Sequence, residues 1–135
     1  MYKYKINDTK KINDIGNKYV IEDENSFNAF INYLENNPNC EVVFYAFDGS
    51  SIERKLFFYL KTLEHLVKLP PCQLEIRSDS ALILIALPIL KKISQIVRIE
   101  LTAVRGSRPE EIIKAAKAIR EHNLPVKVRY LKRLN

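Results

Sequence analysis

The chain has 135 residues, of which 47% are hydrophobic, so one domain with a sizeable core is expected. No apolar run approaches the roughly 20 residues that a membrane-spanning helix needs, and the first residues lack the apolar stretch of a secretory signal. Charge is unevenly spread: residues 91–135 carry 12 Lys and Arg against 4 Asp and Glu, whereas residues 1–90 carry 10 against 12. These features exclude a membrane-spanning protein and favour a cytoplasmic one whose basic last third faces nucleic acid or an acidic partner.

The two cysteines show no metal-binding spacing. Cys40 and Cys72 each precede a predicted strand, so buried thiols in a reducing compartment are expected, and no cofactor is implied. Few glycines, no tryptophan and many Ile, Lys and Glu residues favour a thermophilic source.

The first part of the chain, residues 1–38, predicts two short strands and one helix. The strands cover residues 2–6 and 18–22 and could pair with each other across the polar stretch between them. Residues 26–36 place four apolar side chains at helical spacing, which predicts a short amphipathic helix. Pro38 separates this part from a more regular pattern.

Residues 39–133 predict a regular alternation of strands and helices. The first element is a continuous apolar run, which is typical of a strand covered on both faces. The predicted order is strand 41–47, helix 51–68, strand 73–77, helix 81–93, strand 95–103, helix 109–122 and strand 125–130. The pattern predicts a single α/β domain, 1–135, with three layers: a mainly parallel sheet of about five strands with helices on both faces.

Polar residues and prolines mark the predicted helix ends. Ser50 and Glu53 form a capping-box pattern, and Gly49 is expected to make the tight turn before it. Ser107 is expected to cap the last helix. Pro88 should kink or shorten the helix in which it lies.

Three polar corners follow predicted strands, at residues 48–51, 78–80 and 103–107. Ligands of parallel sheets bind beyond the carboxyl ends of the strands, and helix N-termini attract anions. Asp, Ser and Gly also form ordinary turns and caps, so the residues alone leave both interpretations open. A metal site is poorly supported, because Asp48 and Asp79 are joined by no histidine at this edge of the sheet.

The stretch Ala46-Phe47-Asp48-Gly49-Ser50-Ser51 resembles the D-x-D-G-x-S motif of the RecJ-like DHH phosphoesterases. Val104-Arg105-Gly106 stands where that family has a metal-binding D-x-G, and no histidine pair follows the last strand. The resemblance covers about residues 40–133 and implies the fold of the DHH N-terminal domain. It also implies a degenerate metal site at Ala46, Asp48 and Val104, hence no catalysis and no bound metal.

Inactive RecJ-like proteins serve as subunits of replicative helicase complexes. The resemblance therefore implies a non-catalytic component of an archaeal helicase assembly of the CMG type, which binds GINS and supports MCM at the nucleoid. Two sets of aromatic residues are the candidate protein interface: Tyr2 and Tyr4 on the first strand, and Phe57, Phe58 and Tyr59 on a helix.

Two alternatives remain open. The first is a small basic nucleic-acid-binding protein that resembles the Alba type and contacts DNA or RNA through basic side chains. Its candidate residues are Arg105, Arg108, Lys127, Arg129, Lys132 and Arg133. The second, less favoured, is a metal-dependent nuclease that uses Asp48 and Asp79.

Overall fold

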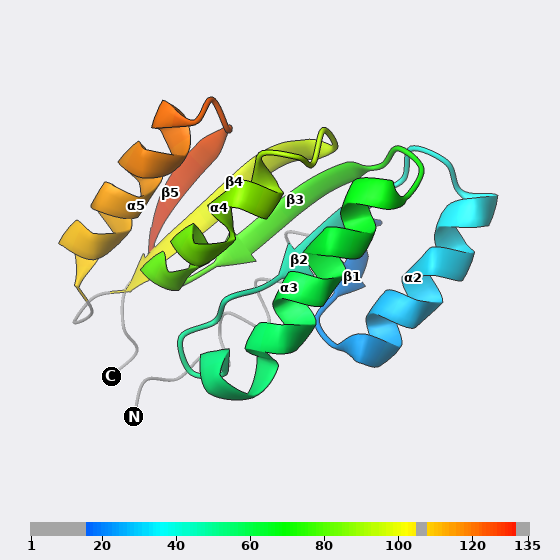
Figure 1. The fold of residues 1–135 in the computed structure, drawn as a ribbon, viewed down its shortest axis with the longest axis horizontal. Coiled ribbons are helices and arrows are strands. Elements are labelled where there is room, and N and C mark those ends of the chain that lie inside the picture. The colour runs from blue at the N-terminus through cyan, green and yellow to red at the C-terminus, as the bar shows by residue number, and fades with distance from the viewer. Residues whose placement is uncertain (1–15, 105–107, 132–135) are drawn as a thin grey trace.

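Five parallel strands form one sheet in the computed structural model, which describes residues 16–104 and 108–131. The strands are β1 (Tyr19–Ile21), β2 (Glu41–Tyr45), β3 (Gln73–Ser78), β4 (Ile96–Val104) and β5 (Val126–Leu131). They lie side by side in the order in which they occur in the chain (Figure 1). The predicted α/β class and parallel five-stranded sheet are confirmed. The strand predicted over residues 2–6 lies outside the described residues.

Helical segments connect the strands. They are α2 (Glu24–Asn36), α3 (Ile52–Lys68), the 3-10 helix η1 (Ala81–Ala86), the single turn α4 (Leu87–Leu90) and α5 (Pro109–Glu121). The predicted helix 81–93 is thus a 3-10 segment followed by one α-helical turn, with Pro88 in the first turn of α4. Proline is tolerated there because the first turn has no backbone acceptor for its missing N–H.

The helices of the described chain pack on one face of the sheet (Figure 1). Every crossover steps to the next strand in the same direction, and right-handed crossovers of that kind place all helices on the same side. Within residues 16–104 and 108–131 no helix covers the opposite face, which we call the second face. Of the two faces that we expected helices to cover, this part of the chain has helices on one.

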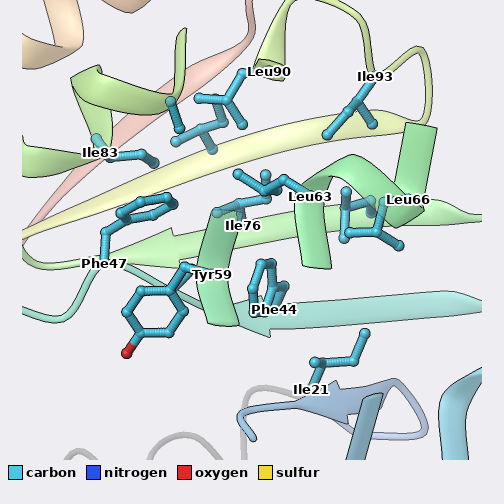
Figure 2. Packing of buried hydrophobic residues seen from close by; sticks show 14 of the residues in the cluster. Ile21, Phe44, Phe47, Tyr59, Leu63, Leu66, Ile76, Ile83, Leu90 and Ile93 are labelled. Atoms are coloured by element: carbon cyan, nitrogen blue, oxygen red, sulfur yellow. The ribbon is translucent and has the colours of Figure 1, made fainter. Parts of the chain in front are cut away.

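The core lies between the sheet and the helical layer. Alternate strand residues such as Phe44, Ile76 and Leu101 point into it and are fully buried. Figure 2 shows Tyr59 and Leu63 from α3 beside Phe44 and Ile76, with other apolar side chains of the helical layer. One hydrophobic cluster extends from β1 to α5, so β1 and α2 share a core with the alternating part of the chain.

The start of α2 shows how a cap decides a helix boundary. The Asp23 carboxylate accepts a hydrogen bond from Ser26 N (2.8 Å), and Ser26 Oγ accepts one from Asp23 N (3.0 Å). This reciprocal capping box satisfies two donors that a helix N-terminus leaves open. The helix therefore begins two residues before the predicted 26–36.

Candidate functional site

The corner after β2 is held by its own polar groups. Asp48 Oδ1 accepts hydrogen bonds from the backbone N–H and the hydroxyl of Ser50, both at 3.2 Å. The N-cap of α3 is Ser51, which makes no side-chain capping bond. The predicted capping box of Ser50 and Glu53 is wrong, because the Ser50 side chain is engaged by Asp48 in a local turn.

The sharp change of direction comes from Phe47 rather than from Gly49. Phe47 adopts a left-handed backbone conformation with φ of 57° although it is fully buried. Gly49 does not adopt a positive φ. Its N–H instead donates a hydrogen bond to Asp79 Oδ1 at 2.9 Å. Gly49 therefore contributes a close contact with the next corner and not a left-handed turn.

A second link joins the corners after β2 and β3. Ser78 Oγ donates to the carbonyl oxygen of Phe47 at 3.0 Å, and Ser80 Oγ accepts from Leu82 N at 3.1 Å at the start of η1. These polar side chains satisfy backbone groups of the corners themselves. The two predicted ligand corners are thus brought together, and their interactions brace the carboxyl edge of the sheet.

The degenerate metal positions do not converge on an ion site in the described chain. Ala46 is 1% exposed and belongs to the hydrophobic core. Val104 ends β4 with Leu131 as its partner in register, and residues 105–107 lie outside the description. Among the described residues, no group of three or more His, Cys, Asp or Glu side chains is placed to hold a metal.

The candidate aromatic interface on α3 divides into buried and exposed side chains. Tyr59 is 2% exposed and packs against Phe47, with ring centroids 5.2 Å apart (Figure 2). Burial, with the charge of Asp48, raises the pKa of Tyr59 to about 12. Phe58 is half-buried against the core, whereas Phe57 is 77% exposed. Of the three, Phe57 alone offers most of its surface to a partner, and Tyr2 and Tyr4 lie outside the described residues.

The second face carries a network of ion pairs across β3, β4 and β5. Glu75 pairs in register with Arg98, and Arg77 with Glu100, so each carboxylate faces a guanidinium on the next strand. Arg98 Nη2 donates to Glu75 Oε1 at 2.9 Å, and Arg77 Nε donates to Glu75 Oε2. We call these four residues, together with Lys18 and Arg129, the ion network.

Lys18 and Arg129 extend the network on either side. Lys18 Nζ lies 3.5 Å from Glu75 Oε1, and Arg129 Nη1 lies 3.5 Å from Glu100 Oε1. Glu75 and Glu100 are each 3% exposed. Burial alone would raise the pKa of Glu75, but the hydrogen bond and charge of Arg77, with Arg98 and Lys18, hold that pKa below its ordinary value. The network therefore keeps a buried carboxylate ionised.

Three of the six predicted nucleic-acid-binding residues are described. Lys127 is exposed on β5, and Arg129 belongs to the ion network on the same face. Arg108 lies apart at the start of α5, where it pairs with Glu111 at 3.2 Å. The other three predicted residues, Arg105, Lys132 and Arg133, lie outside the described chain.

Sequence reasoning missed Lys18, Glu75, Arg77, Arg98 and Glu100. A signal for them was present, because charged residues alternate with apolar ones along β3 and β4. Alternation with a period of two indicates a strand with one apolar and one polar face. Read in this way, the sequence would have predicted a polar second face.

No protein-family model, curated protein or solved structure matches this chain. None of the described helices combines the length and the apolar character that crossing a membrane requires. The placement of the side chains therefore carries the functional argument.

Proposed function

We propose that this protein is a non-catalytic binding subunit, and that β5 at the edge of the sheet receives an extended segment of a partner protein. The observation that carries the proposal is the position of β5. It is six residues long and, within the described chain, pairs with β4 alone. An edge strand presents backbone donors and acceptors on which another strand can add.

The side chains of β5 indicate the chemistry of that partner. Lys127 is exposed, and Tyr130 is 63% exposed. A basic residue and an exposed aromatic residue favour an acidic segment that carries an apolar anchor. At the opposite edge of the described sheet lies β1, which has three residues and offers a shorter template.

The strand order supports a role without catalysis. Ligand crevices in open parallel sheets form where the strand order reverses, and this sheet runs from β1 to β5 without reversal. At the carboxyl edge, Asp48 and Asp79 accept hydrogen bonds from Ser50 and Gly49. These groups serve the turns, which leaves them poorly suited to two-metal chemistry.

The partner that we propose is the one implied by the RecJ-like resemblance, namely GINS, with MCM, in a replicative helicase assembly at the nucleoid. The test measures the affinity of the full chain for purified GINS and for purified MCM by calorimetry. Lys127→Glu should weaken binding about tenfold, which corresponds to about 1.4 kcal/mol. Lys68→Glu is the matched control, because Lys68 is exposed at the end of α3 and should leave affinity unchanged.

The outcomes separate the parts of the proposal. If neither GINS nor MCM binds at any salt concentration, the proposed partner is wrong. If binding occurs but Lys127→Glu and Tyr130→Ser both retain full affinity, then the surface at β5 is wrong.

Nucleic acid is the second candidate, favoured by the excess of cations on the second face. Lys18, Arg77, Arg98, Lys127 and Arg129 share that face with Glu75 and Glu100. Phosphate binding should weaken steeply with salt. Fluorescence anisotropy with duplex and single-stranded DNA over a salt series tests this candidate, and a flat response or no binding would remove it.

A further inference from the structure

The two cysteines, far apart in the sequence, meet at the amino ends of neighbouring strands. Glu41 pairs in register with Gln73 at the starts of β2 and β3, so the residues before them, Cys40 and Cys72, stand opposite each other. The backbone supports this placement, because Gln73 N donates to the carbonyl oxygen of Cys40 at 2.9 Å. β2 and β3 are adjacent in the sheet (Figure 1).

Both thiols lie on the core side of the sheet. Cys72 belongs to the hydrophobic cluster and is 6% exposed, while Cys40 packs against the same cluster and is half-buried. Burial raises the pKa of Cys72 to about 11, and the adjacent Cys40 thiol adds to that rise. Burial also raises the pKa of Cys40. The electrostatic influence of one thiol on the other agrees with their opposed positions.

We propose that Cys40 and Cys72 form a reversible intramolecular disulfide that links the starts of β2 and β3. Neighbouring strands lie roughly 4.8 Å apart, and the Cα atoms of a disulfide are usually about 4.4–6.8 Å apart. The bond therefore requires side-chain rotation and little backbone movement. It would close a loop that contains all of α3.

The oxidant that we assign is a small-molecule disulfide. The thiolate of Cys40, the more exposed residue, attacks one sulfur of that disulfide and releases one small thiol. The Cys72 thiolate then attacks the Cys40 sulfur of the mixed disulfide and releases the second thiol. The protein loses two electrons and two protons, and the small disulfide gains them.

The raised pKa values make both thiols slow nucleophiles at neutral pH. Formation of the bond should accordingly become faster as the pH rises. Because the bond is reversible, a reducing compartment holds the thiol form and an oxidising one holds the disulfide.

The test uses the full native chain and oxidised glutathione. The remaining free thiols are alkylated, and the chain is then cleaved at basic residues of α3, which lie between the two cysteines. A disulfide keeps the two resulting peptides joined, and mass spectrometry detects the joined pair. We expect the wild type to yield the Cys40–Cys72 peptide pair, with loss of the mass of two hydrogen atoms, and dithiothreitol to reverse it.

Single variants define the route. Cys72→Ser should stop at a glutathione adduct on Cys40, and Cys40→Ser should react slowly because Cys72 is buried. If a wild-type Cys40 adduct accumulates without resolving, or if both thiols stay free under conditions that modify Cys72→Ser, the proposal is overturned. Linkage between two chains only would also overturn it. Should Cys72→Ser fold poorly, Cys72→Ala supplies the same comparison.

Discussion

Replacing Glu75 by Gln removes the charge at the centre of the ion network. The carboxylate is 3% exposed and meets Arg77, Arg98 and Lys18. The substitution preserves size and one acceptor oxygen but turns an amide group towards a guanidinium. Loss of one partner from a buried ion pair costs about 3–5 kcal/mol, and partial exposure of Arg98 screens part of this, so we expect about 3 kcal/mol.

That loss is a large part of the free energy of unfolding of a typical domain, which is roughly 5–15 kcal/mol. Urea denaturation followed by circular dichroism measures it. With a slope of about 1–3 kcal/mol per M, the midpoint should fall by about 1–3 M without a change of slope.

Glu111→Gln is the matched control for Glu75→Gln. Glu111 pairs with Arg108 at 3.2 Å, but the two side chains are 53% and 78% exposed. An exposed pair contributes about 0–1 kcal/mol, so this variant should unfold near the wild-type midpoint. If Glu75→Gln costs no more than Glu111→Gln, the network does not contribute to stability as its geometry indicates.

Three further predictions concern pH, the core and the carboxyl edge. Folding lowers the pKa of Glu75, so the ionised carboxylate stabilises the fold above the ordinary pKa of 4.5, and this stabilisation is lost as the pH falls through the lowered, folded-state pKa. The urea midpoint of the wild type should therefore drop over this pH range, and that of Glu75→Gln should drop less. Tyr59→Ala should cost about 3–5 kcal/mol in urea denaturation, whereas Phe57→Ala, at an exposed position, should cost little; equal losses would contradict the packing. Asp48→Ala should cost about 1 kcal/mol through the lost Ser50 bonds, and in a nuclease assay neither wild type nor variant should cleave DNA with Mn²⁺. Cleavage that disappears in Asp48→Ala would revive the nuclease hypothesis.

Local sequence signals placed most strands and helices close to their observed bounds. β3, β4 and β5 each begin within one residue of the predicted start, because apolar runs bounded by polar residues or proline fix a strand. At α3 the boundary was close, but the predicted cap was wrong, because two groups competed for the Ser50 side chain. Asp48 engages Ser50 before it can cap α3, and no propensity rule decides between those two bonds.

The strand order was beyond local signals. The alternation of strands and helices fits several orders, and the observed one depends on contacts between segments far apart in the chain. The continuous apolar run of β2 predicts burial on both faces, and Val43 on the second face is as fully buried as Phe44 on the core face. β3 carries a different signal, since Glu75 and Arg77 alternate there with Leu74 and Ile76.

The strand order also changes the interpretation of the Asp-Gly-Ser-Ser corner. In a sheet whose order reverses, such a corner opens onto a crevice between diverging connections. Here the connections after β2 and β3 run in the same direction and lie against each other, so Asp79 accepts from Gly49 and Ser78 donates to Phe47. Residues that a phosphoesterase would direct at metal ions hold two neighbouring turns together. The proposed binding at β5 uses a different part of the sheet, namely the edge that β5 forms within the described residues.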